Sequence, residues 1–132
     1  MINFKAATAL QLAAAKITST TSHAEKDLAG NVASVGKRQV MATATIFPRA
    51  STDPATDETC DSKIQESATT ADTDFGDITG AAFTQVADES TAASETIYFP
   101  VTKRYVRAVS TLAGTTPAFT VGITLFVENR QA

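Results

Sequence analysis

The stretch Phe119-Thr120-Val121-Gly122-Ile123-Thr124-Leu125-Phe126-Val127 carries the most regular pattern in the chain. Bulky apolar residues occupy every second position from Phe119 to Val127, and small or polar residues lie between them up to Thr124. This period of two predicts a β-strand with one buried face and one solvated face. A helix would spread the same apolar residues around its circumference.

A second strand is predicted just upstream, over Arg104–Leu112. The residues between the two strands, Ala113–Pro117, have the composition of a turn, because glycine supplies unusual backbone angles and proline is tolerated at a strand entrance. We therefore expect a C-terminal hairpin at the centre of the fold.

Composition limits the class of protein. A chain of 132 residues fits one domain with one core, and its alanine and threonine content of about a third suits a thin sandwich of β-sheets. The net charge of −3 argues against a nucleic-acid-binding groove, which needs a basic surface. The single cysteine, Cys60, cannot form an internal disulfide, and one thiolate cannot make a four-ligand zinc cluster.

The N-terminal residues 1–16 are rich in alanine, leucine and glutamine, which are good helix formers. The segment is too weakly apolar for a secretion signal and too short to cross a bilayer, so we expect no membrane partner. We predict a short helix or an extended arm that serves attachment and is dispensable for folding. Residues 17–132 then form a single β-sandwich domain.

Further short strands separated by turn-rich segments are predicted along the rest of the chain. Together they give about seven or eight strands, the spacing of an all-β, antiparallel two-sheet sandwich of the jelly-roll type. Pro48 is expected to end one of them, and the polar residues 49–59 are expected to form a surface loop. The additional strands are expected at residues 18–23, 39–47, 60–67 (with Cys60, Ser62 and Ile64 inward), 78–86 (broken around Gly80) and 95–100.

Few residues are candidates for chemistry. His23 is the only histidine and is interpreted as a surface residue. Asp72, Asp74 and Asp77 lie close enough in sequence to suggest a calcium loop, but they lack the EF-hand pattern, and an ordinary turn is the preferred interpretation. Motifs of nucleophilic, metal-dependent and nucleotide-dependent enzymes do not occur in the sequence. We therefore expect no enzyme activity, no catalytic or metal-binding residues and no cofactor.

Arg104 and Arg107 are three residues apart and fall on opposite faces of a regular strand. One of them is expected to lie over the sheet or at an interface, while a solvated strand edge is the default position for either.

Several stretches taken together resemble small structural proteins encoded beside the major capsid protein in tailed bacteriophages, a group that includes jelly-roll cement (decoration) proteins. The likeness covers roughly residues 64–127, with a looser match at 39–47; the N-terminal segment and the loop 49–59 depart from it. The stretches that carry it are Lys63–Ser67, Asp74–Val86, Lys103–Val109 and Gly114–Val121.

The resemblance implies a virion protein that is assembled in the host cytoplasm, binds the outer capsid surface and stabilises the lattice of the major capsid protein. It also implies self-association, as a homo-dimer or a homo-trimer. Two alternatives stay open at this stage. One is a tail or neck component, and the other is a carbohydrate-binding or host-receptor-binding sandwich, which the lack of tryptophan disfavours.

Overall fold

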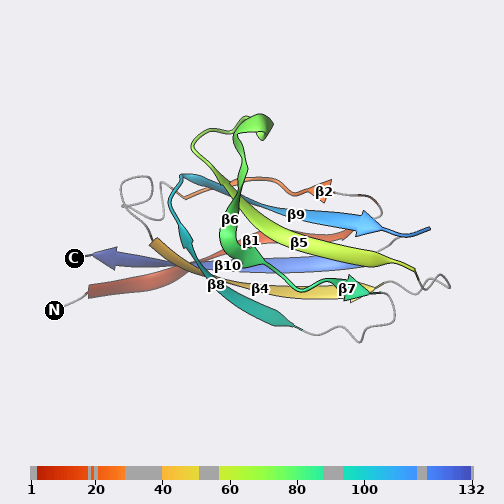
Figure 1. Cartoon of the computed structure of the whole chain (residues 1–132). Helices are drawn as coiled ribbons and strands as arrows, with labels where there is room; N and C mark the ends of the chain where they lie inside the picture. Colours follow the sequence, from red (N-terminus) through yellow and green to blue (C-terminus); the bar gives the residue numbers. More distant parts are fainter. Residues whose placement is uncertain are drawn as a thin grey trace.

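The computed structural model describes residues 3–17, 19, 21–28, 40–50, 57–87, 94–115 and 119–131, and these residues form ten strands and one turn of 3-10 helix, η1. The strands lie in two layers (Figure 1). Their bounds are β1 Asn3–Ile17, β2 Thr21–Ser22, β3 Lys26–Asp27, β4 Val40–Ala50, β5 Thr59–Ser67, β6 Gly76–Ala82, β7 Val86–Ala87, β8 Glu95–Val101, β9 Tyr105–Ala113 and β10 Phe119–Gln131, with η1 at Asp72–Asp74.

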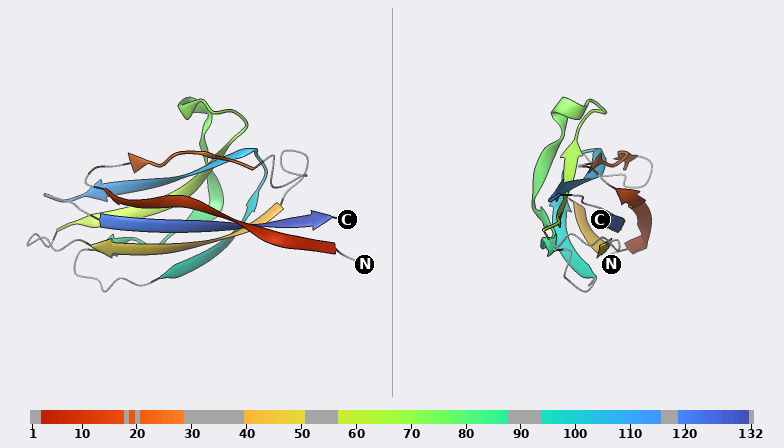
Figure 2. Two further views of the ribbon diagram at one scale, coloured as in Figure 1. Left: turned by 180° about the vertical axis from the view of Figure 1, so that it is seen from behind. Right: turned by 90° about the vertical axis from the view of Figure 1, so that its right-hand side faces the viewer.

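Two antiparallel sheets face each other. Sheet A has the strand order β1-β10-β4-β8, and sheet B has the order β2-β9-β5-β6, in which β3 also pairs with β9 and β7 also pairs with β5. The two layers are separate when the molecule is seen along its strands (Figure 2, right). The expected antiparallel two-sheet sandwich is confirmed.

The strand pairs are nested in the chain as in a jelly roll. The first strand pairs with the last, β2 and β3 pair with β9, β4 pairs with β8, and β5 pairs with β6 and β7. β2 and β3 can be counted as two halves of one interrupted strand, and so can β6 and β7. Each sheet then has four strand positions. This is the eight-stranded arrangement of a double-sheet jelly roll.

The core lies between the sheets and follows the predicted alternation. The five apolar residues at alternate positions of the opening stretch, from Phe119 to Val127, are fully buried, and each such burial stabilises the fold by about 1.5–3 kcal/mol. The inward positions of β5 were also predicted correctly, since Cys60, Ser62 and Ile64 are buried. Alanines at several inward positions keep the two layers close. Those alanines are Ala42, Ala44, Ala81 and Ala108.

The predicted C-terminal hairpin is wrong. β9 belongs to sheet B and β10 belongs to sheet A, so the two strands cover the core from opposite sides. The connection that includes Gly114 and Thr115 therefore crosses between the layers and does not fold one strand back on its neighbour. The alternating patterns identified both strands, but alternation does not tell which partner a strand pairs with.

Of the two alternatives expected for residues 1–16, a short helix or an extended arm, the helix is wrong. Residues Asn3–Ile17 form β1, which pairs with β10 along almost its whole length, with two register shifts, between Lys5 and Thr8 and between Gln11 and Ala13. Pairing with β10 overrides the local helix propensity of alanine, leucine and glutamine. Removal of β1 would uncover the backbone edge of β10, so we now expect its deletion to destabilise the sandwich.

Strand β4 continues beyond its predicted end. Pro48 lies inside β4 and is opposite Val121 of β10. The pairing of β4 with β8 stops at Ile46, so at Pro48 the strand has a neighbour on one side only, and a missing N–H is tolerated there. Two other details differ from expectation: β6 and β7 separate at residues 83–85 and not at Gly80, and Glu58, expected in a surface loop, is fully buried.

Gly114 provides a direct test of the crossing between the sheets. Its φ is +117°, and a Cβ at this position would lie 2.8 Å from the Cα of Glu58 and 2.9 Å from the carbonyl oxygen of Asp57. Gly114→Ala should therefore lower the free energy of unfolding by about 1–3 kcal/mol, measured by urea denaturation. Gly76→Ala is the control, because a Cβ there meets no atom within 4 Å and should change stability by less than about 0.5 kcal/mol. Equal effects of the two substitutions would contradict the assigned strain.

Candidate functional site

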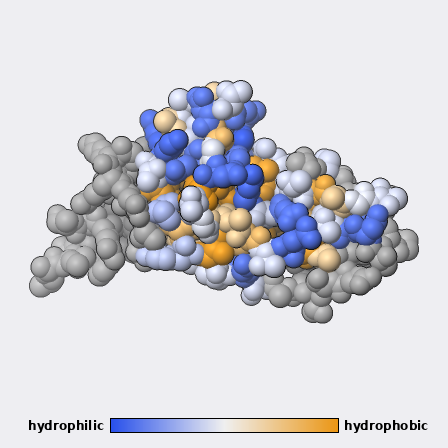
Figure 3. Space-filling view, viewed as in Figure 1, coloured by the Kyte–Doolittle hydropathy of each residue, from blue (hydrophilic) through white to orange (hydrophobic). Residues whose placement is uncertain are grey.

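The most prominent feature outside the two layers is the connection between β5 and β6, residues 68–75, which we call the arch. It includes η1 and extends past the sheets (Figures 1 and 2, green). Every residue from Ala68 to Asp74 is exposed, and the surface over this part of the molecule is hydrophilic (Figure 3). The arch therefore presents a run of polar side chains and backbone to the surroundings.

Arg107 of β9 attaches the arch to sheet B. Its Nη1 donates to Asp72 Oδ1 at 2.9 Å, and its guanidinium carbon lies 4.2 Å from the ring centroid of Phe75. Its Nε donates to Gln65 Oε1 at 3.0 Å, and Gln65 is the register partner of Arg107 in β5. Because Phe75 and Asp72 cover it, the arginine is only 9% exposed on the outer face of the sheet. A cation stacked on an aromatic face and paired with a carboxylate is a strong local anchor.

The arch also contains its own hydrogen bonds. Thr69 Oγ1 donates to Asp74 Oδ2 at 2.5 Å and accepts from the N–H of Ala71 at 3.2 Å. The N–H of Thr69 donates to Ser67 Oγ at 3.0 Å, and Ser67 is fully buried at the end of β5. The shape of this exposed segment is therefore fixed before it contacts anything.

The three aspartates proposed as a calcium loop point to different partners. Asp72 pairs with Arg107, Asp74 with Thr69, and Asp77 with Lys63 and Gln65 of β5. Hydrogen bonds from Gln65 and then Lys63 hold the pKa of Asp77 below its ordinary value. Over the described ranges, no group of three or more metal-ligating side chains is brought together. The ordinary-turn interpretation fits this geometry.

Other carboxylates fix connections elsewhere in the sandwich by binding both polar groups of a single threonine. Glu66 accepts from the N–H and the hydroxyl of Thr102, at 2.8 and 2.9 Å, where β8 leads into β9. Glu95 does the same for Thr84 between β6 and β7, at 2.8 and 3.2 Å. A third such pair joins Asp57 to Thr115, at 3.3 and 2.7 Å, and these hydrogen bonds lower the pKa of Asp57.

The two arginines have different environments. Arg107 lies over sheet B, as expected for one of the pair, so the solvated-edge interpretation is wrong for it. Arg104 is exposed, forms a two-point contact with Asp27 of β3 at 2.9 and 2.8 Å, and lies 5.1 Å from the ring centroid of Tyr105. It therefore fixes the edge of sheet B.

His23 is half-buried and takes part in a row of polar side chains on the inner face of sheet B, which the sequence did not suggest. Its Nε2 lies 3.2 Å from Ser110 Oγ, which lies 2.9 Å from Ser62 Oγ. Cys60 Sγ follows at 3.7 Å, and burial raises the pKa of this thiol. A histidine beside a serine is the pairing used in nucleophilic catalysis, but Ser110 has no solvent exposure for a substrate to reach. The row joins the edge segment around His23 to β9 and β5.

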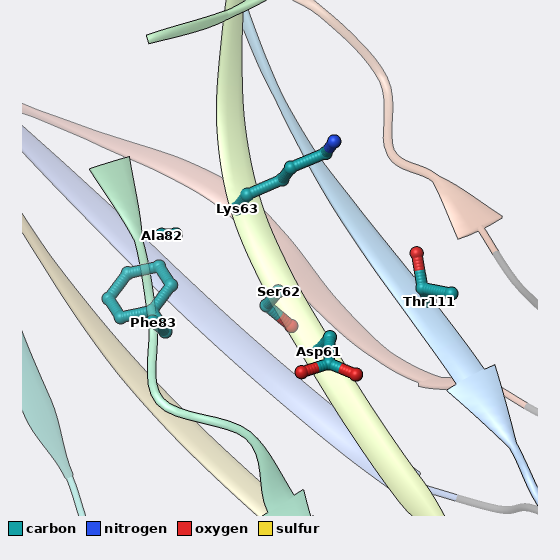
Figure 4. A pocket seen from close by; sticks show the side chains of 6 residues that line it. All are labelled: Asp61, Ser62, Lys63, Ala82, Phe83 and Thr111. Carbon is teal, nitrogen blue, oxygen red and sulfur yellow. The ribbon is translucent and has the colours of Figure 1, made fainter. Parts of the chain in front are cut away.

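A shallow pocket of about 240 Å³ lies beside β5, between Phe83 and Thr111 (Figure 4). It is smaller than most ligand sites. Both charged residues in its lining are already engaged, because Asp61 accepts from Gln85 Nε2 at 2.8 Å and Lys63 lies 2.9 Å from the Asp77 carboxylate.

Within the described ranges, no helix is long and apolar enough to cross a membrane.

Comparison with known proteins gives no sequence relative and a weak similarity to a viral structure. No protein-family model matches the chain, and no curated protein sequence matches it. Among solved structures, the chain is similar to a chain in the structure of the infectious bursal disease virus Gx strain, with a TM-score of 0.47 and 8% sequence identity. The alignment covers 98% of this chain and 33% of the viral one, so this protein spans about a third of that chain's length. The fold assignment rests on the strand order and not on this similarity.

The half-buried position of His23 predicts a pH dependence of stability. Burial lowers its pKa from 6.5 in the folded protein, so the unfolded chain takes up the proton first as the pH falls. The free energy of unfolding should be highest above pH 6.5 and should decrease as the pH falls from there through the folded pKa. One proton limits the slope to about 1.4 kcal/mol per pH unit, and partial exposure makes it smaller. His23→Gln should make the free energy of unfolding, measured by urea denaturation, depend less on pH between about pH 7.5 and pH 5. Ordinary carboxylates titrate below this range. An unchanged slope would contradict this role.

The anchoring role of Arg107 can be tested against Arg104. Arg107→Met removes the contacts to Asp72, Phe75 and Gln65, and should cost about 1–3 kcal/mol of stability, a range that allows for the exposure of Asp72. Amide exchange of Asp74 and Phe75, whose N–H groups bond to Ala71 and Asp72, should become faster. Arg104→Met should leave these two amides unchanged, because Arg104 contacts β3 and Tyr105. Faster exchange in both variants would show general destabilisation.

Proposed function

We propose that this protein is a non-enzymatic structural component of a tailed-bacteriophage virion that binds the outer surface of the capsid. Its partner is the major capsid protein, and its role is to stabilise the assembled lattice. Two findings support the proposal: the resemblance carried by the stretches between Lys63 and Val121, and the jelly-roll strand order, which also occurs in capsid domains.

The observation that carries the proposal is the arch. It projects from the sheets, exposes Ala68 to Asp74 continuously, and is held by Arg107, Phe75 and its internal hydrogen bonds. A contact element that is already ordered loses little conformational entropy on binding, so more of its contact energy contributes to affinity. This is the property that a small protein needs to bind a large, rigid surface.

The uses of the acidic side chains also favour a structural role. Glu66, Glu95 and Asp57 hold loop threonines, while Asp72 and Asp77 pair with cationic side chains. Side chains engaged in this way define shape and are poorly suited to proton transfer. Many exposed polar groups therefore serve rigidity, which a binding module requires.

Stabilisation of a shell follows from mass action. A protein that binds the assembled lattice and not its separated subunits shifts the equilibrium toward assembly. Where one attached protein contacts several capsid subunits, its first contact raises the effective concentration for the next ones, which strengthens the binding. The expected signature is saturable binding together with a higher disruption temperature of the shell.

The direct experiment is co-sedimentation of the purified protein with capsids that lack it, followed by heating of bare and decorated shells. We expect binding to saturate at a fixed ratio to the major capsid protein and the disruption temperature to rise. Thr70→Glu with Thr73→Glu should weaken binding at least about tenfold, because both residues are exposed on the arch and the change adds like charges beside Asp72 and Asp74.

Thr111→Glu is the matched control, since Thr111 is exposed on β9 away from the arch and should bind normally. Absence of capsid binding would overturn the proposal. Binding to glycans or host cells would then identify a receptor-binding module, and binding to purified tails or necks would identify a component of those structures.

A further inference from the structure

The outer face of sheet A differs from the rest of the described surface. Residues that point away from the core on its strands alternate with the buried set of β10 and β4. We call the resulting surface the threonine face. The described residues that form it are Gln11, Thr43, Thr45, Thr96, Tyr98, Pro100, Thr120, Gly122, Thr124 and Phe126.

The threonine face carries both large hydrophobic residues that stand out as exposed among the described residues. Tyr98 is 57% exposed and Phe126 is 40% exposed. The sheet register places both opposite Thr43 of β4, one on each side, so they share a single row across the sheet at about 10 Å separation. Exposed aromatics that gather on one flat face are typical of protein–protein contacts.

The neighbouring row contains polar but uncharged residues. Gln11, Thr124, Thr45 and Thr96 are aligned across all four strands, and the hydroxyls of Thr45 and Thr96 are 2.9 Å apart. Neither of these two central rows has an Asp, Glu, Lys or Arg among its described side chains, while the strand register places Lys16 and Arg49 at one end of the face, on either side of Thr120. Sheet B, in contrast, has charged pairs on its outer face, including Lys63 with Asp77.

An uncharged centre suits contact of the face with itself. In a two-fold contact each side chain near the axis meets its own copy, so a charged side chain there would meet a like charge. Threonine hydroxyls both donate and accept hydrogen bonds and can therefore pair with identical hydroxyls. The composition of the two central rows, with Tyr98 and Phe126 in one and Thr124, Thr45 and Thr96 in the other, thus satisfies the condition that an isologous interface imposes near its axis.

The size of the face is also sufficient. Nine residues of β10 pair with β4, and β10 has 13 residues in all. At about 3.3 Å per residue and about 4.8 Å between strands, the four strands present on the order of 600–800 Å². Standard protein interfaces bury about 800 Å² on each partner, so this face is large enough for a dimer.

We propose that the threonine face binds a second copy of this chain in an isologous, two-fold contact centred on Tyr98, Phe126 and the threonine rows. The contact is a property of the isolated protein and does not depend on the capsid role. It brings the sheet A layers of two molecules together and leaves both sheet B layers on the outside.

Sedimentation velocity of the full-length protein from about 1 μM to about 1 mM is the test. We expect a concentration-dependent monomer–dimer equilibrium. Thr96→Lys adds a positive charge to the face of each copy and should weaken dimerisation on the order of a hundredfold. Tyr98→Ser with Phe126→Ser should weaken it at least about tenfold, through loss of buried aromatic surface from both copies.

Thr111→Lys is the matched control, because it is the same substitution at an exposed position on sheet B and should leave the dimer intact. Circular dichroism melting of each variant shows that the fold is retained. A protein that stays monomeric at about 1 mM overturns the proposal. The proposal is also overturned if Thr111→Lys dissociates the dimer and Thr96→Lys does not. A trimer also overturns the two-fold contact. If the unmodified protein is monomeric at every concentration and Thr96→Lys loses binding to capsids or glycans, the threonine face binds that partner instead.

Discussion

Strand β10 is hydrogen-bonded on both sides, to β1 and to β4, and its five inward side chains from Phe119 to Val127 are fully buried. The remaining pairs are nested inside the pair of the first and last strands, so closing of the sandwich brings the two ends of the chain together. These pairings are long-range in sequence, and their entropy cost must be met before the core forms. The burial along β10 is therefore the interaction on which the rest of the sandwich depends.

A sandwich with so few charged residues uses them in specific places. Three carboxylates each hold the N–H and the hydroxyl of one loop threonine, and a fourth, Asp72, ties the arch to Arg107. Three of these pairs join segments at least 35 residues apart, and the fourth joins Glu95 to Thr84, so each limits the freedom of a connection after the core has formed. Surface pairs of this kind contribute little to overall stability but reduce the number of loop conformations. The rigid arch is one result of this pattern.

The sequence predicted the strands with strict alternation, because burial of one face leaves a period of two that depends only on local order. It predicted β10 and β5 in this way, with the correct inward residues, and it predicted β4 as a strand. It did not predict β1, whose alanines favour a helix locally and become a strand only through pairing with β10. It also placed β9 and β10 in one hairpin, because residue alternation contains no information on strand partners. The anchor of the arch was missed for the same reason: Arg107, Phe75 and Asp72 meet only once β5, β9 and the arch are in place.

The arch and the threonine face lie on different parts of the molecule, and their relative directions constrain how a dimer would contact a shell. In the view along the strands, the arch rises on the β9 side of sheet B, perpendicular to the strands, while sheet A forms the opposite layer (Figure 2, right). A two-fold axis within the contact and parallel to the strands would turn the two arches in opposite directions. An axis across the strands would keep both arches on one side, where two ordered elements could engage one surface. Only the second arrangement gains effective concentration from dimerisation, so a dimer that serves shell binding requires the strands of the two copies to run antiparallel across the contact.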